Sequence, residues 1–572
     1  MSGARGTAGV SAEAMEALGG VLRADQVEGA AWLPACIGDA PRAAAGEGAG
    51  GGRGVRVFAE SEAECVALVE WARRYGCALY PVSRGRNWGY GSSRPTRAGS
   101  VVLDLSRMDR VVEFDEGLGT ATVEPGVTQG GLRAFLDERG GGYLVPVTGA
   151  GPEASIVGNA LERGYGITPY SDHFGALTSL RAVLGDGSIY ESALASAGAD
   201  RADRAYKWGV GPYLDGLFSQ GGGGIVTRAT IALARAGHIV EAFVFSVDRE
   251  SSLEPAVEAV GEVLWRVGAN LGAVNLMNGR RVLSMTEPYP SHEVSRGEVI
   301  SEARVEAMCR RHGVGPWVGI GVVYGERCVA KAVRGVIRRA LGGRVRKLRF
   351  MTRGKVGRLA RLAKAAPGAR AAALGRKAAA LERALVNFEG SPSEVALPLC
   401  YWKSGRRPAA GAAMDPAADG CGLIWYSPLV TAEPGVVRAY AEFVGSTCRA
   451  HGIEPLITLT SISPRCFDST VPILFDRSDG EEVGRAHACY EALLQEGRAR
   501  GFMPYRVPTA WMDRIVDPAS GFWRTAAAVR RSIDPDGVVA PGRYAPDAAS
   551  AAGRPARSPG DRSVEPPVHA GA

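Results

Sequence analysis

The sequence contains no long apolar run and few residues that could bind a metal. The longest uncharged apolar stretch, from Val314 to Tyr324, includes one proline and three glycines. It is shorter than the ~18 residues that a membrane span needs. The first nine residues lead into no apolar segment of the kind found in secretory signals. Ten cysteines are scattered without a C-x-x-C pair, and seven histidines are equally dispersed. We therefore expect a cytoplasmic protein with reduced thiols, no membrane span and no metal site.

Several motifs of nucleotide-binding and hydrolytic enzymes are also missing. No strand is followed by G-x-G-x-x-G and a helix, and G-x-x-x-x-G-K-[ST] does not occur, so Rossmann and P-loop sites are unsupported. G-x-S-x-G and H-E-x-x-H are absent too, which disfavours the common hydrolases. The net charge of +7 is modest for 572 residues and does not indicate a nucleic-acid partner.

Glycine is abundant. The chain has 78 glycines among 572 residues, nearly twice the usual ~7%. They follow no fixed period, so they indicate many turns and close approaches of the backbone. The length allows about two to four domains. Helix and strand patterns are interspersed without a regular βαβ repeat, which predicts the α+β class.

Residues typical of helix ends and of turns predict where the first helices and strands lie. Residues 61–64 form a capping-box sequence that opens an amphipathic helix, and Gly76 is typical of the residue that ends one. Thr128 is expected to cap a second helix reaching Arg139. Gly185-Asp-Gly187 predicts a tight turn between two strands. Strands are expected at residues 78–82, 101–105, 120–123, 181–184, 188–190 and 225–232.

Three stretches have a biased composition. Residues 38–55 are rich in Gly and Ala and predict a flexible link, and residues 546–572 predict a disordered tail. Residues 353–383 carry nine basic residues and one acidic residue among many alanines, which favours helix interrupted near Pro367-Gly368. This segment is either a solvated helical connection or an arm that binds RNA or an acidic partner. We prefer the connection, because no aromatic residues interleave the charges.

Five glycine-containing segments stand beside polar residues and strand ends. Glycine lets main-chain N–H groups converge on an anion without obstruction by side chains. Arg84 and Arg86 would add positive charge to the first segment, and Asn87 would add hydrogen-bonding capacity. Each segment alone is an ordinary turn, but together they predict a site for a phosphate-containing cofactor. The segments are residues 83–91, 124–128, 149–159, 163–170 and 220–224.

Longer motifs run through these segments in a fixed order. They are PVSRGRNWGYG at 81–91, VGN at 157–159, RGYGITPYSDH at 163–173, GVGPYLDGLFSQ at 209–220 and DPDGVVAPGR at 534–543. The set resembles the vanillyl-alcohol oxidase / p-cresol methylhydroxylase family. The resemblance covers about residues 12–545; it is strong over 56–235 and 500–545 and weak through the middle.

The resemblance implies an α+β flavoenzyme of two domains, with FAD as cofactor. A p-cresol methylhydroxylase-type (PCMH-type) FAD-binding domain would be covered by an α+β cap domain over the flavin ring. Asn159 and His173 lie in motifs that border the flavin, although His173 could equally be a hydrogen-bonded structural residue. The implied divisions are an N-terminal segment 1–55, the FAD-binding domain 56–236, the cap 237–500, a C-terminal strip 501–545 completing the flavin site, and the tail 546–572. The residues expected to bind FAD are Ser83, Arg84, Gly85, Arg86, Asn87, Gly89, Gly126, Gly158, Asn159, Gly164, His173, Ile225 and Arg543.

In the family, two tyrosines and an arginine bind a para-substituted phenol as phenolate, and Tyr90, Tyr505 and Arg506 match those positions. A permanently charged guanidinium and two phenol hydroxyls form a charge-assisted cluster around an oxyanion. A phenolate pushes electrons toward the para carbon, so hydride leaves toward the flavin and a quinone methide results. The expected reaction is oxidation of a 4-substituted phenol. The weak match through the middle leaves open a non-phenolic alcohol or amine from a specialised biosynthetic pathway.

The sequence departs from the family pattern at two places. Asp468 or Ser469 falls where many members carry the His or Tyr that links FAD covalently, so we expect dissociable FAD; a shift in alignment would bring Cys466 there instead. Oxidase members carry an acidic residue near the flavin where this chain has Ala150, with Glu153 a little downstream. Without that acid, desaturation or cyclisation could replace addition of water to the quinone methide.

The expected partners are a small-molecule substrate and an electron acceptor. The acceptor is either dioxygen or a small redox protein, because access of oxygen depends on one or two side chains near the flavin. Family members are often dimers, so a homodimer is a further expectation by analogy. No nucleic acid and no membrane are expected as partners.

Overall fold

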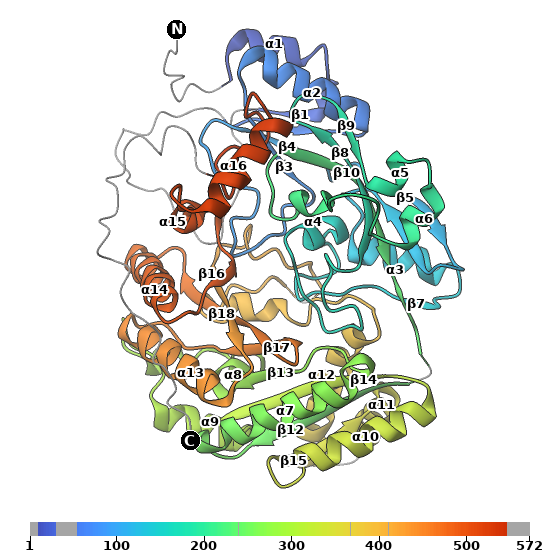
Figure 1. The fold of residues 1–572 in the computed structure, drawn as a ribbon. Helices are drawn as coiled ribbons and strands as arrows, with labels where there is room; N and C mark the ends of the chain where they lie inside the picture. Colours follow the sequence, from blue (N-terminus) through green and yellow to red (C-terminus); the bar gives the residue numbers. More distant parts are fainter. Residues whose placement is uncertain (1–9, 30–53, 238, 366–367, 410, 546–572) are drawn as a thin grey trace, which may run out of the picture.

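The computed structural model describes residues 10–29, 54–237, 239–365, 368–409 and 411–545. The tail at 546–572 lies outside these residues, as does the link expected at 38–55 except for its last two residues. The described strands form one sheet of four, one of five, one of eight and a two-stranded ribbon. Figure 1 shows the two smaller sheets in the N-terminal part of the chain, above the eight-stranded sheet.

The first sheet has the order β1-β2-β4-β3. Strands β2, β4 and β3 are parallel, and β1 is antiparallel at the edge. Two helices share a buried core with it. The strands are β1 (Val27–Glu28), β2 (Arg56–Phe58), β3 (Leu79–Val82) and β4 (Val101–Asp104), and the helices are α1 (Ala12–Leu18) and α2 (Glu62–Tyr75).

Helix α2 begins and ends where the sequence predicts. The Ser61 hydroxyl accepts a hydrogen bond from the Glu64 N–H, and Gly76 ends the helix with a φ of 65°. The Glu64 carboxylate accepts from the N–H of Glu60, so the reciprocal bond falls one residue before the N-cap. The chain then passes into β3, whose carboxyl end leads into the first glycine loop.

The second sheet is antiparallel, with the order β5-β6-β10-β8-β9. The predicted turn at 185–187 joins β8 and β9, and β8 begins four residues before its expected start. Thr128 caps α3 by accepting a hydrogen bond from Gly131. The elements are β5 (Val111–Asp115), β6 (Thr120–Val123), β8 (Leu177–Leu184), β9 (Ile189–Glu191), β10 (Gly224–Ala232), α3 (Gln129–Asp137), α4 (Ile156–Leu161), α5 (Ala193–Ser196) and α6 (Asp200–Ala205), and the ribbon pairs β7 (Tyr143–Leu144) with β11 (Ala234–Arg235).

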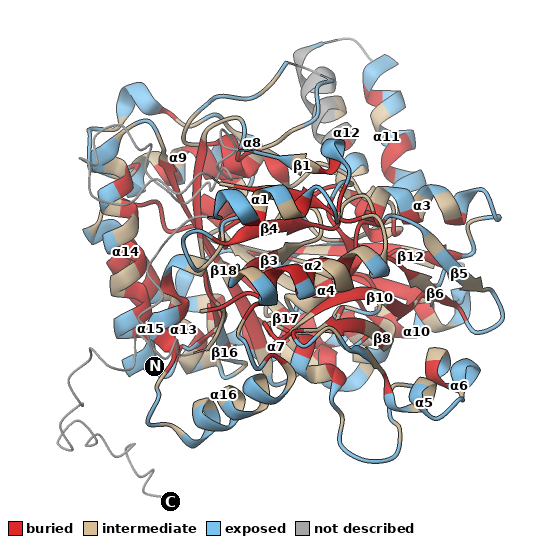
Figure 2. Cartoon of the chain, turned by 90° about the horizontal axis from the view of Figure 1, so that it is seen from above, coloured by how far each residue is buried: buried red, intermediate tan, exposed pale blue. Residues whose placement is uncertain are grey.

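The eight-stranded sheet has the order β15-β12-β14-β13-β17-β18-β16-β19. Its apolar side chains pack mainly with those of four long helices in the largest core cluster. Figure 2 shows the strands as mostly buried and the outward faces of the helices as exposed. The strands are β12 (Ile239–Val247), β13 (Asn275–Asn278), β14 (Trp317–Gly325), β15 (Arg346–Met351), β16 (Cys421–Thr431), β17 (Thr458–Ser463), β18 (Cys466–Asp476) and β19 (Pro504–Arg506), and the helices are α7 (Leu253–Val267), α10 (Arg327–Leu341), α13 (Pro434–Ala450) and α14 (Gly480–Ala499).

The basic, alanine-rich segment forms two helices, α11 (Arg353–Ala365) and α12 (Ala369–Phe388), with the predicted interruption between them. Val356 and Leu385 are buried with residues of β12 and β14. Leu359 and Leu362 are exposed. The segment is therefore anchored to the large sheet along part of its length, which favours the interpretation as a helical connection.

The C-terminal strip touches both halves of the molecule (Figure 1). Strand β19 pairs with β16 at the edge of the large sheet. Further on, the N–H of Leu79 donates to Val538, and the N–H of Ala540 donates to Leu79, which places residues 538–540 beside β3. The remaining helices are α8 (Gly279–Thr286), α9 (Glu302–His312), α15 (Met512–Ile515) and α16 (Gly521–Ile533). None of the described helices is long and apolar enough to cross a membrane.

Candidate active site

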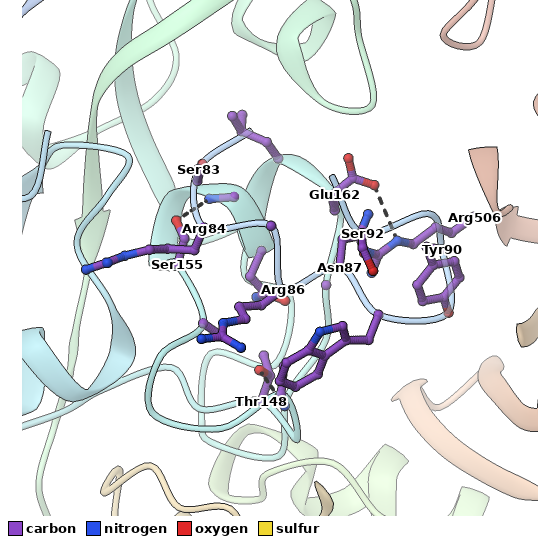
Figure 3. A pocket seen from close by; sticks show the side chains of 18 of the residues that line it. Ser83, Arg84, Arg86, Asn87, Tyr90, Ser92, Thr148, Ser155, Glu162 and Arg506 are labelled. Carbon is purple, nitrogen blue, oxygen red and sulfur yellow. Dashed lines mark hydrogen bonds and ion pairs between the residues drawn. The ribbon is translucent and has the colours of Figure 1, made fainter. Parts of the chain in front are cut away.

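A cavity of about 410 Å³ lies where these parts meet. One wall comes from the loop after β3, helix α4 and residues 220–226 of the N-terminal sheets. The opposite wall comes from β16, β18, α8 and residues 396–400, and the C-terminal strip adds residues 505–506, 540 and 543. Figure 3 shows the polar side chains of the first wall. The cavity therefore gathers segments that are far apart in the sequence.

The loop after β3 carries the predicted cluster of polar residues. Ser83, Arg84, Gly85, Arg86 and Asn87 all line the cavity. Gly85 has a φ of 65°, a left-handed conformation that favours glycine. The Arg84 Nε donates to the Gly126 carbonyl at 2.8 Å, and Arg86 forms an ion pair with Asp415, which precedes β16 in the chain. Both arginine side chains thus help to hold the loop in its conformation.

Gly158 allows the loop and α4 to approach each other. The Ser155 hydroxyl caps α4 by accepting from the Gly158 N–H at 2.8 Å. A Cβ on Gly158 would lie 3.0 Å from the Ser83 hydroxyl oxygen and 3.1 Å from its Cβ. A side chain at this position would crowd Ser83, so glycine lets the loop and the helix lie this close together. Glycine-lined loops with serine and threonine hydroxyls are the setting in which a pyrophosphate is held by backbone N–H groups, so this wall fits FAD.

Gly158, Asn159, Gly164 and Arg543 also line the cavity, as predicted, but four predicted FAD-binding residues do not. Gly89 lies against the Trp425 ring, and Gly126 supports Arg84 from behind. The Ile225 side chain belongs to the core and does not line the cavity. Side chains alternate along β10, so its neighbours Gly224 and Val226 face the cavity instead.

His173 acts through Asn159 rather than at the cavity. The His173 Nδ1 is hydrogen-bonded to the Asn159 side-chain amide. Burial lowers the pKa of His173 to about 4, so the imidazole is neutral at physiological pH. His173 therefore holds the Asn159 side chain in place through this hydrogen bond and does not line the cavity itself.

Tyr90, Tyr505 and Arg506 come together at the cavity, although Tyr90 is separated from the other two by more than 400 residues. Figure 3 shows the Arg506 side chain beside Tyr90. The guanidinium carbon lies 3.9 Å from the centroid of the Tyr90 ring. The Tyr90 hydroxyl is hydrogen-bonded to Ser427 of β16. Burial raises the pKa of Tyr90 well above its usual range, so the phenol stays protonated. The three predicted residues thus offer one fixed cation and two phenol hydroxyls.

A carboxylate and a second arginine set the charge around Arg506. The Arg506 Nε lies 3.4 Å from the Glu162 carboxylate, and Arg543 pairs with the same carboxylate from its other oxygen. Asn87 accepts a further hydrogen bond from Arg506. While the nearby Asp468 carboxyl is protonated, two positive charges against the one Glu162 carboxylate leave one positive charge at this end of the cavity. That excess fits the binding of one anion.

Asp468 of β18 is a functional candidate that the sequence placed differently. We expected it at the position of a covalent link, but its carboxyl lines the cavity and is 4% exposed. One of its oxygens, Oδ1, has no hydrogen-bond partner. Burial raises the pKa of Asp468 to about 7, and the charge of Arg506 opposes that rise. An acidic residue that is buried inside a strand was the available signal.

The other positions discussed for covalent attachment or base catalysis do not face the cavity. Ser469 accepts a hydrogen bond from the Tyr440 hydroxyl at 2.7 Å in the core, and the Cys466 thiol donates to the Phe467 carbonyl. Glu153 is exposed, whereas Ala150 lines the cavity. Asp468 is therefore the titratable group best placed to exchange a proton inside the described site.

Known proteins with similar sequences include FAD-binding enzymes, in agreement with a cofactor site in this cavity. A family model described as an FAD binding domain matches residues 54–193. The chain is 34% identical to the 1'-carboxy-chondrochloren decarboxylase of Chondromyces crocatus over 85% of this chain and 89% of that protein. It is 25% identical to the flavoprotein subunit of 4-cresol dehydrogenase [hydroxylating] of Pseudomonas putida, over 85% of this chain and 87% of that one.

The chain belongs to the vanillyl-alcohol oxidase / p-cresol methylhydroxylase family. Its fold also matches a crystal structure of p-cresol methylhydroxylase with substrate bound, with a TM-score of 0.74 at 23% identity over 86% of this chain and 88% of that chain. The predicted PCMH-type FAD-binding fold and the FAD cofactor are thereby confirmed.

This member of the family is an FAD-dependent oxidoreductase. When bound, FAD supplies an acceptor for the hydride that leaves a substrate. The cavity residues of the loop 83–87 and of α4 would hold it, together with Arg543. Among the described residues, no three His, Cys, Asp or Glu side chains gather as a metal site would require.

Proposed function

We propose that the protein oxidises a 4-substituted phenol by removing a hydride from the para side-chain carbon. The main support for this proposal is that Tyr90, Tyr505 and Arg506 all line one end of the cavity. Arg506 is a permanent cation in surroundings that leave one positive charge in excess. A phenolate oxygen would neutralise that excess, and its charge would activate the carbon at the opposite side of the ring.

Asp468 can accept the proton that this reaction releases. Conversion of a 4-alkylphenol to a quinone methide releases one hydride and one proton, and the proton comes from the phenol. Asp468 interacts electrostatically with Tyr90, Tyr505 and Arg506, so it lies near the phenol end. A carboxyl with a pKa of about 7 can accept that proton at neutral pH and return it to water later.

The direct test is anaerobic titration of the holoenzyme with a panel of 4-alkylphenols while the flavin spectrum is recorded. We expect bleaching of the flavin by 4-ethylphenol and none by ethylbenzene, which has the same side chain but no phenol. Reduction by simple alcohols or amines, with no response to the phenols, would instead favour a non-phenolic donor.

A second candidate is oxidation coupled to loss of a carboxylate from the para side chain. It is supported by the 34% identity with a decarboxylase and by the absence of an acid at Ala150 that could promote addition of water. After hydride loss from the carbon next to the ring, the bond from the following carbon to the carboxylate breaks. Carbon dioxide leaves, and the electron pair forms the side-chain double bond as the ring regains aromaticity. Mass spectrometry of products from a carboxylated phenol distinguishes this outcome from hydroxylation.

We also propose that FAD binds without a covalent bond. Of the three residues considered for the link, only Asp468 lines the cavity, and a carboxyl does not suit a stable link. Denaturation of the holoenzyme in acid should release all the flavin into the supernatant. Fluorescence that stays on the denatured protein band in a gel would contradict this prediction.

The electron acceptor, the location and the oligomeric state remain predictions. Dioxygen and a small redox protein are both compatible with the site. A cytoplasmic location rests on the cysteine pattern, and the nine cysteines of the described part form no disulfide. The homodimer and the implied domain boundaries rest on the family resemblance.

A further inference from the structure

Two consecutive arginines of α8, Arg280 and Arg281, are both buried but have different surroundings. The Arg280 guanidinium pairs with Glu454 at 2.5 Å, lies 3.0 Å from Glu302, and donates to the Ile300 carbonyl at 2.8 Å. Arg280 is thus a fully paired structural cation.

Arg281 lines the cavity and has no such partners. Its guanidinium reaches only the Ser284 hydroxyl at 3.5 Å, and its Nε has no hydrogen-bond partner. Within the described residues, no carboxylate forms an ion pair with it, and the only ionisable group that acts on it is the Cys400 thiol. Burial keeps that thiol protonated by raising its pKa to about 12, so it provides no counter-charge.

A buried cation without a partner is costly, and proteins retain such groups mainly at functional sites. Burial lowers the pKa of Arg281 to about 10, which still leaves the guanidinium charged at neutral pH. Leu397, Leu399 and Leu423 line the same cavity and pack in one apolar cluster with Leu283 of α8. A ligand that enters here must therefore bring both apolar surface and a negative charge.

The position of Arg281 separates it from the phenol end. Arg281 comes from α8, whereas Asp468 and Arg506 come from β18 and β19. Arg281 also belongs to the wall of α8 and residues 396–400, whereas the residues that fit FAD come from the facing loops. An anion at Arg281 would thus be bound by other residues than those proposed to bind the phenolate and the cofactor phosphates.

We propose that Arg281 binds a carboxylate carried by the side chain of the phenol substrate, and that it selects substrates with that group. The inference rests on the proposed function, because it assumes that the phenol end lies at Arg506. A guanidinium can donate two parallel hydrogen bonds to a carboxylate, which fixes its orientation as well as its charge. The natural substrate class is therefore a 4-hydroxyphenyl compound with a carboxylate on its para side chain.

The test compares Arg281→Met with the wild-type holoenzyme, using 3-(4-hydroxyphenyl)propanoate and its methyl ester as probes. We expect the wild type to bind the carboxylate more tightly than the ester. In the variant, the Kd of the carboxylate should rise about 100-fold, whereas that of the ester should hardly change. Arg281→Lys should keep part of the preference, because it keeps the charge but loses the planar fork.

Thermal unfolding provides an independent readout that needs no turnover. Without substrate, Arg281→Met should be at least as stable as the wild type, because it removes an unpaired buried charge. Arg280→Met is the matched control, and it should lower Tm clearly because Glu454 loses its partner. The carboxylate probe should raise the Tm of the wild type and leave that of Arg281→Met nearly unchanged.

Several results would overturn the inference. An equal loss of affinity for carboxylate and ester would mean that Arg281 only shapes the cavity. Weaker binding of FAD in Arg281→Met would assign the anion to the cofactor. If both probes bind with the expected difference but neither reduces the wild-type flavin, the proposed phenol oxidation fails while the carboxylate site stands.

Discussion

Replacing Arg506 with alanine should slow flavin reduction by a 4-alkylphenol about 1,000-fold, because it removes the fixed cation that stabilises the phenolate. Arg506 and Arg543 share the Glu162 carboxylate, so without Arg506 the charge of Arg543 is balanced by Glu162 and no positive charge remains in excess. The rate constant is measured by anaerobic stopped-flow absorbance of the flavin at saturating phenol.

A second readout separates this role from a structural one. The wild type should bind a 4-substituted phenol as phenolate at neutral pH, visible in its ultraviolet difference spectrum, and Arg506→Ala should bind it as the neutral phenol. Arg506→Lys is expected to recover part of the rate and of the phenolate signal, since it retains a charge. Bound FAD should remain near normal, because Arg543 still pairs with Glu162. Unchanged reduction kinetics in Arg506→Ala would defeat the phenolate assignment.

Much of the wall formed by the N-terminal sheets could be predicted from the sequence because its signals are local. The cap at Ser61, the left-handed Gly76 and the glycine loop after β3 each depend on neighbours in the chain. The loop residues 83–87 then line the cavity as expected. Ile225 shows the limit even here, since the sequence does not reveal which face of β10 meets the ligand.

The opposite wall could not be predicted in the same way. Strand β19 has only three residues, and it is defined by pairing with β16 about 80 residues away, a contact that leaves no local pattern. The contrast between Arg280 and Arg281 is similar. The two residues are identical and adjacent, yet the partner that neutralises Arg280 lies 174 residues further along the chain. Which buried charge is structural and which is functional thus depends on long-range packing.

Asp468→Asn is expected to lower the rate of flavin reduction by about 100-fold or more above pH 7, because it removes the proton acceptor. In the wild type, the rate should rise with pH through about 7 as Asp468 ionises, and then level off. In the variant, the rate should stay low and lose this dependence. A 4-alkylphenol is a suitable substrate, since its own ionisation lies near pH 10.

The same substitution should stabilise the protein at neutral pH. Burial raises the pKa of Asp468 from 3.8 to about 7. Between these values the folded state holds a proton that the unfolded state has lost, so the free energy of unfolding falls as pH rises. Asparagine does not ionise, so the Asp468→Asn variant does not lose free energy of unfolding in this way. Its Tm should exceed the wild-type Tm above pH 7, and the difference should shrink as pH falls toward 4.

Asp215 supplies a matched control for both effects of Asp468→Asn. It is another buried carboxyl with a raised pKa, caused by burial, but its two oxygens accept hydrogen bonds from Tyr190 and Ser192, and it does not line the cavity. Asp215→Asn should change stability while the pH profile of flavin reduction keeps its wild-type shape. If Asp468→Asn also kept the rise through pH 7, the titrating group would be a different one, and Asp468 would not be the base. A lost rise together with a higher Tm would show that the carboxyl at 468 is retained for proton transfer at the expense of stability.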